Sequence, residues 1–363
     1  MSTPRLFLGN FDFEHRLADP RRQLTNHLQR INAELAMSWL AIADDGDMIW
    51  TPQAIEPGFF ERATAEGLSK VVPVVSLDSV PSGVECLPWG WTDEIRQLCD
   101  LRGWIRNDPP ESSVLATNSR RFSSDLESQW QAGLEGAGSI RSQEDLHRYI
   151  ASLESVAQWV IKAEFGMSGR ERILGRGIPT ESQGRWIEKH LNAGGVVFFE
   201  PWVERMAEAG IQIDIPRTGP PTLIGIVPLL SDERGQYIGS VFAPQEAEAL
   251  AGEWEKAVQI ALQASERAQA LGYFGPMGID AMHYRDRDGS SRFRPLQDIN
   301  ARWTMGRLSL GWRRFLQPGE SGFWCFDSGR RLRHDPNVRR VIPTSPQAVG
   351  GSPSHFASAI YLS

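Results

Sequence analysis

The chain has 363 residues, a length typical of two or three domains. Hydrophobic residues make up 41% and charged residues 23%, as in an ordinary globular protein. The formal net charge of −7 argues against general binding to nucleic acid, and three cysteines without a Cys-x-x-Cys pair exclude a disulfide framework. No apolar run approaches the roughly 18 residues of a membrane span. We therefore expect a cytoplasmic protein whose partners are neither nucleic acids nor membranes.

The first part of the chain alternates between strand-like and helix-like segments. We expect strands at residues 5–9, 39–43 and 70–76. We expect helices that begin at Asp19 and Pro20, near residue 57 and at Thr92, because such residues favour a helix start. This alternation predicts a small parallel α/β domain over residues 1–108, with ligands at the carboxyl ends of its strands. Three polar residues follow the end of the first strand: Asn10, Asp12 and Glu14. Their position alone makes them candidates for contact with substrate.

The next region, residues 109–200, contains a lysine on a strand followed by a glycine-rich loop. Residues 159–163 predict the strand that carries Lys162, and the loop behind it contains Gly166, Ser168 and Gly169. Backbone N–H groups of such a loop approach phosphate oxygens closely. Taken alone, however, a solvated hairpin loop is the more common explanation of this pattern.

A later strand is expected to end at Glu200, since Pro201 cannot continue the hydrogen-bond ladder. It follows helices that we expect near residues 123–131, from Ser142 and over 180–193. An antiparallel meander over residues 210–227 and a long helix between Pro244 and Gly272 come next. We expect a helix at residues 307–315 and an irregular tail after it.

Two apolar segments place acidic side chains around residues 280 and 298. Alternate side chains of a strand share one face, so Asp298, Asn300 and Arg302 should project together. Asp280 joins them if the two segments pair. Such oxygen ligands suit Mg²⁺ with substrate phosphates, although either acid alone is more often a solvent-facing partner of an arginine. Just beyond this motif, Trp303, Met305 and Arg307 are candidates for an acceptor pocket, whereas His283 is interpreted as structural.

With Lys162, the strand end at Glu200, and Asp280, Asp298 and Asn300 in this order, residues 110 to 320 resemble the ATP-grasp superfamily. The resemblance implies an α/β fold, α+β in its nucleotide lobes, in which two lobes clasp ATP. Residues 1–108 would form the pre-ATP-grasp domain and residues 109–200 the central or lid lobe. Residues 201–363 would form the C-terminal lobe with the metal site and the tail.

The resemblance also implies roles for individual residues. The residues that would contact phosphate are Arg120, Lys162, Gly166, Ser168 and Gly169. At the position of Arg120 a lysine is usual in the family. Adenine contacts fall to Glu200, Trp202 and Val203, and the ribose contact to Glu208, with Glu204 an alternative. The metal ligands would be Asp280, Asp298, where glutamate is usual, and Asn300, with Mg²⁺ or else Mn²⁺ bound. Arg302 and Lys162 would be catalytic.

The implied activity is ADP-forming ligation of a carboxylate to an amine through an acyl phosphate, which forms a C–N bond. An amino acid or a short peptide is the default substrate of the family, and homodimers are common in it. Two alternatives stay open. One is a small-molecule kinase on the same fold, and the other is a nucleotide-binding protein without turnover.

Overall fold

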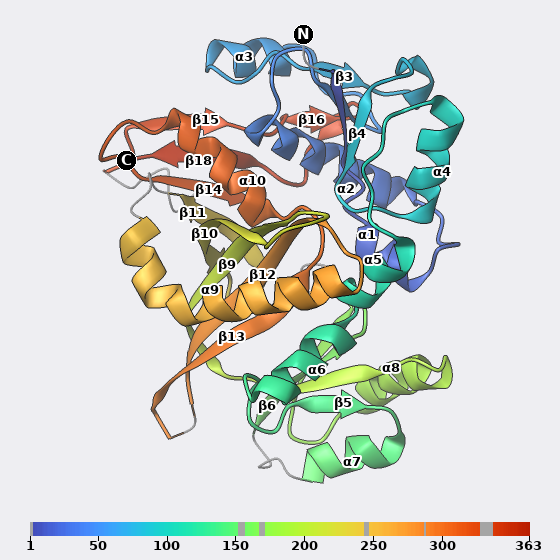
Figure 1. Cartoon of the computed structure of the whole chain (residues 1–363), viewed down its shortest axis with the longest axis vertical. Coiled ribbons are helices and arrows are strands. Elements are labelled where there is room, and N and C mark those ends of the chain that lie inside the picture. The colour runs from blue at the N-terminus through green and yellow to red at the C-terminus, as the bar shows by residue number, and fades with distance from the viewer. Residues whose placement is uncertain (1–2, 152–156, 167–170, 243–246, 287, 327–336) are drawn as a thin grey trace.

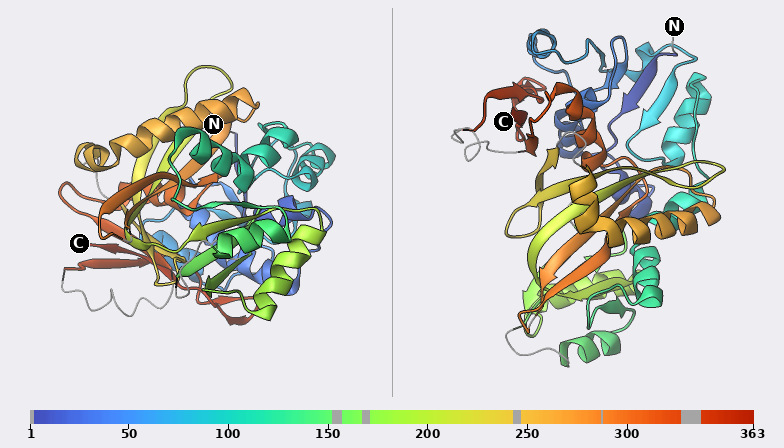
Figure 2. Two further views of the ribbon diagram at one scale, coloured as in Figure 1. Left: turned by 90° about the horizontal axis from the view of Figure 1, so that it is seen from below. Right: turned by 60° about the vertical axis from the view of Figure 1, so that its left-hand side comes forward.

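The computed structural model describes residues 3–151, 157–166, 171–242, 247–286, 288–326 and 337–363. Three larger sheets and one two-stranded hairpin organise these residues (Figure 1). A parallel sheet lies at one end of the molecule and a four-stranded antiparallel sheet at the opposite end, with an eight-stranded antiparallel sheet between them (Figures 1 and 2). The predicted α/β fold class is confirmed.

The parallel sheet has the strand order β3-β2-β1-β4. Its strands are β1 (Arg5–Leu8), β2 (Met48–Trp50), β3 (Val72–Val74) and β4 (Glu85–Pro88). The helical segments around it are α1 (Phe13–Ala18), α2 (Asn26–Ala36), η1 (Met37–Ala41), α3 (Phe59–Ala65), η2 (Leu77–Ser79) and α4 (Asp93–Arg102). As predicted, Thr92 caps α4, because its side chain accepts a hydrogen bond from the Ile95 N–H.

Two predictions for this region are wrong. The helix expected at Asp19 and Pro20 begins at Asn26 instead, because the Thr25 side chain caps it by accepting from the Leu28 N–H. The strand expected at residues 39–43 is largely the η1 turn, whose residues are all buried. A short apolar run buried on every side looks alike in a strand and a helix, so periodicity could not separate them.

The four-stranded antiparallel sheet has the order β5-β8-β6-β7. Its strands are β5 (Gly138–Ile140), β6 (Gln158–Ala163), β7 (Arg172–Arg176) and β8 (Val197–Pro201). The helices of this region are α5 (Glu111–Asn118), α6 (Arg120–Trp130), α7 (Gln143–Ala151) and α8 (Glu181–Asn192). The predicted strand exit at Glu200 and Pro201 is confirmed by the end of β8.

The large sheet runs in the order β13-β12-β9-β10-β11-β14-β18-β15. Its first five strands in the chain are β9 (Glu204–Ile215), β10 (Thr222–Ser231), β11 (Tyr237–Phe242), β12 (Gly275–Arg285) and β13 (Ser291–Asn300). Helix α9 (Ala247–Ala270) packs on one face of strands β9, β10, β12 and β13 (Figure 1). Buried Ile211, Ile213 and Ile279 face the α9 core, so their alternate neighbours face the other side.

The tail is not irregular, contrary to the prediction. After α10 (Met305–Gly311) and η3 (Trp312–Phe315), the strands β14 (Gly322–Phe326), β15 (Arg340–Pro343) and β18 (Ser358–Leu362) extend the large sheet. A short hairpin pairs β16 (Ala348–Val349) with β17 (Ser352–Pro353). Burial of Trp324 and Ile360 anchors these strands in the core. Short strands whose partners lie far along the chain leave little local signal.

Among the described helices, none is long and apolar enough to cross a membrane. The division of the chain into domains at residues 108 and 200 stays a prediction.

Candidate active site

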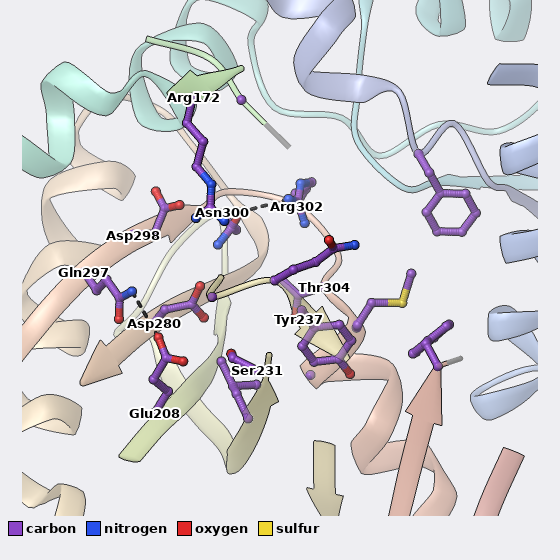
Figure 3. A pocket seen from close by; sticks show the side chains of 18 of the residues that line it. Arg172, Glu208, Ser231, Tyr237, Asp280, Gln297, Asp298, Asn300, Arg302 and Thr304 are labelled. Atoms are coloured by element: carbon purple, nitrogen blue, oxygen red, sulfur yellow. Dashed lines mark hydrogen bonds between the residues drawn. The ribbon is translucent and has the colours of Figure 1, made fainter. Parts of the chain in front are cut away.

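A cavity of about 280 Å³ opens over the face of the large sheet opposite α9. Its lining comes from all parts of the chain: Phe11 and Trp89 follow strands of the parallel sheet, and Lys162 belongs to β6. Much of the remaining wall comes from strands β9 to β13 of the large sheet. Figure 3 shows Asp280, Asp298 and Glu208 on one side of this space, with Thr304 and Tyr237 further along it.

The floor of the cavity is formed by side chains that lie opposite one another on neighbouring strands. Asp280 on β12 lies directly opposite Asp298 on β13, and Gly278 lies opposite Asn300. Directly opposed residues in an antiparallel pair project from the same face, so the two acids and the amide share the cavity side. The two segments therefore pair, and Asp280 joins Asp298 and Asn300 on one face.

Each of these polar groups has a different environment. Asp298 forms an ion pair with Arg120 at 3.2 Å, and the Asn300 Oδ1 accepts from the Arg302 Nη2 at 2.9 Å. The Asp280 carboxylate has no hydrogen bond or ion pair with any residue that the structure describes. Burial, together with the nearby carboxylates of Asp298 and Glu208, raises the pKa of Asp280 to about 8. An unpartnered acid between other acids is a ready ligand for a cation.

This raised pKa predicts a pH-dependent stability in the absence of ligands. The pKa of Asp280 is about 8 in the folded protein, against 3.8 for an aspartate in water, which represents the unfolded chain. Between pH 3.8 and about 8 the folded protein therefore keeps a proton on Asp280 that the unfolded chain has lost. The contribution of Asp280 to stability should therefore be present below about pH 4 and fall as the pH rises toward 8. Urea unfolding of the wild type and of Asp280→Asn, across this range without Mg²⁺, tests the expectation. The difference in unfolding free energy between the two proteins should grow with pH in favour of the variant, and a constant difference would refute it.

On the far wall, Lys162 belongs to a buried network of charges. Its Nζ lies 2.7 Å from the Glu200 Oε2, and Glu200 in turn contacts Arg294 at 3.1 Å and 3.2 Å. Both oxygens of Glu127 accept from Arg294 as well. Burial lowers the pKa of Lys162, whereas Arg294 and Lys162 outweigh burial and hold the pKa of Glu200 far below its usual range. The network places the Lys162 ammonium at the cavity wall.

Arg302 connects the floor of the cavity to the first helix of the chain. Its guanidinium forms an ion pair with buried Glu14 of α1, donates to Asn300, and lies 5.1 Å from the centre of the Trp89 ring. Another donor of Arg302 meets the carbonyl of Trp303 at 2.8 Å. The side chain is therefore held in one orientation beside the two acids.

Comparison with known proteins identifies the fold. No family model matches this chain, and no curated protein matches it in sequence. N5-carboxyaminoimidazole synthetase from Staphylococcus aureus aligns with a TM-score of 0.53 and 10% identity, over 100% of this chain and 93% of that one. Biotin carboxylase from Campylobacter jejuni aligns with a TM-score of 0.55 and 10% identity, over 100% and 88%. The biotin carboxylase domain of Hydrogenobacter thermophilus 2-oxoglutarate carboxylase aligns with a TM-score of 0.52 and 12% identity, over 100% and 87%.

This chain has an ATP-grasp fold. The ATP-grasp resemblance predicted a set of site residues, most of which line the one cavity: Arg120, Lys162, Gly166, Glu208, Asp280, Asp298, Asn300 and Arg302. Glu200 lies directly behind Lys162. Ser168 and Gly169 fall outside the described residues. The roles assigned to all of these residues stay predictions.

The expected adenine contacts of the ATP-grasp hinge lie outside the lining of this cavity. The Trp202 N–H donates to the Gln158 carbonyl at 2.9 Å, and the Val203 side chain packs with Met282 and Tyr284. The Arg205 guanidinium lies over the Trp202 ring, 4.5 Å from the ring centre. The Trp202 N–H is therefore already satisfied, and Val203 is the more available of the two for a main-chain contact.

Sequence reasoning missed two residues in and behind the cavity. Gln212 lines it beside the acids, and Arg294 fixes Glu200 from behind. Gln212 alternates with Ile211 and Ile213 on β9, so its polar character on a cavity-facing position was the available signal. Of the acceptor-pocket candidates Met305 lines the cavity, whereas Arg307 pairs with Asp214 at 2.8 Å. His283 packs against Trp254 and Phe293, in line with a structural role.

The donor set fits a hard divalent cation. Among the described residues, no group of three or more histidine, cysteine, aspartate or glutamate side chains is placed to hold a metal. The set predicted here contains two carboxylates, Asp280 and Asp298, and the Asn300 amide. All three present oxygen, and Asp280 lacks any other partner in the described part of the chain. Oxygen ligands completed by substrate phosphates are the usual coordination of Mg²⁺.

Proposed function

We propose that this protein is an ATP-dependent ligase that joins a small carboxylate to an amine and releases ADP. One observation carries the proposal: a single cavity holds the cross-strand pair Asp280 and Asp298 together with the cations Lys162, Arg120 and Arg302. Among the solved structures of similar fold, the Staphylococcus aureus synthetase is complexed with ADP, and the Hydrogenobacter thermophilus domain with MgADP and bicarbonate. These complexes support an ATP-utilising site in this chain.

The chemistry requires an activated carboxylate. An amine cannot displace oxide from a carboxylate, so a carboxylate oxygen first attacks the γ-phosphorus of ATP and ADP leaves. The amine nitrogen then attacks the carbonyl carbon of the acyl phosphate, a C–N bond forms, and inorganic phosphate leaves with the C–O bond electrons. Both steps are governed by positioning and charge neutralisation rather than by a protein nucleophile.

The cationic side chains are suited to the phosphate end of this reaction. Lys162 at the wall and Arg120 beside Asp298 would neutralise phosphoryl oxygens. Arg120 offers a planar fork where the fold usually has a lysine, so it would bind two oxygens at once. Glu208, which accepts from Gln297 at 3.2 Å, is the proposed ribose contact.

Asp280, Asp298 and Asn300 would hold Mg²⁺, with Mn²⁺ as an alternative. When bound, the cation would supply charge neutralisation of the β- and γ-phosphates. Asp280 would then lose the proton that its raised pKa retains near neutral pH. Arg302, fixed by Glu14 and Asn300, would orient the carboxylate or the acyl phosphate next to the metal.

A matrix of carboxylates and amines, read as ADP release with mass spectrometry of the products, tests the proposal. We expect ADP and an amide product only when both substrates and Mg²⁺ are present. Amino acids and short peptides are the first compounds to include. A stable phosphorylated product formed without an amine would instead indicate a kinase. Binding of Mg-ATP with no turnover across the matrix would contradict catalysis.

A further inference from the structure

The cavity has two chemically distinct halves. The half over Asp280, Asp298 and Lys162 is crowded with charges. The other half contains apolar side chains. Arg302 lies at the border, because it donates to Asn300 and its guanidinium lies 5.1 Å from the centre of the Trp89 ring. These apolar residues come from distant parts of the chain: Phe11, Ile31, Leu35, Trp89, Met305 and Phe356.

This apolar wall is preformed by packing. Phe11 and Trp89 follow β1 and β4, and their ring centres lie 4.7 Å apart. Ile31 and Leu35 stand four residues apart on α2 and therefore share a face of that helix. The Phe356 N–H donates to the Glu34 Oε2 of α2 at 3.0 Å, which fastens the C-terminal segment against the same helix. The wall is thus part of the folded structure.

One buried amide lines this space, and its NH2 group has no hydrogen-bond partner among the described residues. The Thr304 hydroxyl accepts from the Arg307 N–H at 3.0 Å and donates to the Gln212 Oε1 at 2.7 Å. Since Oε1 is the acceptor in this bond, the Nε2 group of Gln212 is directed away from Thr304. Gln212 is 2% exposed, lines the cavity, and its Nε2 has no hydrogen bond to any described residue.

Two glycines make room for this amide. A Cβ at Gly210 would lie 2.8 Å from the Gln212 Nε2, and a Cβ at Gly306 would lie 2.7 Å from it. Any larger residue at either position would push the amide aside. Gln212 also shares a cross-strand row with Gly278 and Asn300, and Asn300 binds Arg302. The N–H groups of Gln212 and Arg302 therefore border the same part of the cavity.

We propose that this half of the cavity binds the carboxylate substrate, and that this substrate is a small acid with an apolar side chain. The inference rests on the proposed ligase function and narrows its substrate class. Both polar groups at the border are N–H donors, which match carboxylate oxygens and not an amine. Within the described residues, one N–H of the Arg302 Nη1 has no recorded acceptor, in addition to those of Gln212. The apolar group of the acid lies against the wall formed by α2, Phe11 and Trp89.

The test requires no knowledge of the natural amine. Hydroxylamine attacks an acyl phosphate at its carbonyl carbon and yields a hydroxamate and phosphate, so hydroxamate reports activation of the acid. Leucine is compared with asparagine, and 4-methylpentanoate with succinamate, because the members of each pair are similar in size. Burial of the apolar group predicts a kcat/KM roughly 10- to 100-fold higher for the apolar member in at least one pair. Equal values, or a preference for the polar acid, would overturn the inference.

Substitutions in the apolar wall test whether that wall causes the preference for apolar acids. Leu35→Gln and Met305→Gln place an amide at two half-buried lining positions and should reduce the preference to near unity, mainly through KM. Leu101→Gln is the matched control, because Leu101 is 77% exposed and lies outside the cavity lining. An unchanged preference in both wall variants would refute the assignment of this half of the cavity.

A second measurement separates this inference from the ligase proposal. Calorimetric binding of the same acids in the presence of Mg-ADP reports the subsite without turnover. Absence of hydroxamate with every acid would overturn the ligase function, whereas tighter binding of the apolar acids would still support the subsite. Hydroxamate formed equally from apolar and polar acids would leave the ligase function standing and overturn the subsite alone.

Discussion

Replacing Asp298 with asparagine is expected to lower ATP-dependent turnover at least about 100-fold while leaving the fold intact. Asp298 opposes Asp280 across β12 and β13, and its removal would take one of two carboxylates from the proposed cation site. It would also free Arg120, whose only recorded carboxylate partner among the described residues is Asp298. Because the Asp298 side chain is 35% exposed, the lost ion pair should cost less than about 1 kcal/mol of stability.

The measurement is ADP release with the best substrate pair, alongside urea unfolding of the same preparation. Asp288→Asn is the matched control, because Asp288 lies near the tip of the same hairpin and outside the cavity lining. The control should turn over at the wild-type rate. If Asp298→Asn also retained near wild-type turnover, the assignment of Asp298 to the cation site would be wrong.

Replacing Glu200 with glutamine is expected to destabilise the protein by about 3–5 kcal/mol. Glu200 is the only acid that contacts both Lys162 and Arg294 in the described residues, and these cations hold its pKa far below the usual range. Without its charge, Arg294 would keep only Glu127 as a carboxylate partner, and Lys162 would have no ion pair among the described residues. A buried charge without compensation carries a desolvation penalty that the remaining contacts do not offset.

Chemical unfolding of Glu200→Gln measures this loss, with Glu66→Gln as the control. Glu66 pairs with Arg340, but the two side chains are 43% and 46% exposed, so this loss should be less than about 1 kcal/mol. Adding Lys162→Met to Glu200→Gln removes the cation that loses its carboxylate partner and should recover part of the stability, since Arg294 keeps Glu127. If Glu200→Gln had the same denaturant midpoint as the wild type, the buried network would contribute little to the stability of the fold.

Local patterns in the sequence were sufficient to place the polar floor of the site. The alternation of Asp298 with Asn300 predicted a shared face, because strand periodicity is a local property. Asp280 joins this face through the pairing of β12 with β13. The strand of Lys162 was predicted from a local apolar run, and the end of β8 from Pro201, which cannot donate to the ladder. The order of these motifs along the chain was enough to indicate the ATP-grasp fold.

Contacts between distant segments could not be predicted in this way. Glu14 and Arg302 are 288 positions apart, and Glu127 and Arg294 are 167 positions apart. Neither pair leaves a periodic signal, since each depends on how helices dock against the large sheet. The tail strands also depend on a partner from elsewhere in the chain, and β11 provides it.

The sequence by itself determined which side chains share a strand face, because successive side chains of a strand point to opposite faces of the sheet. It thereby predicted a polar floor suited to a cation, whereas the lysine beside it followed from the resemblance to ATP-grasp proteins. Tertiary structure alone decided what surrounds that floor: the buried partners of Lys162, the anchoring of Arg302 by Glu14, and the apolar wall beside Gln212. These features arise where separate segments pack together, and packing depends on the shape of the whole chain rather than on any local pattern.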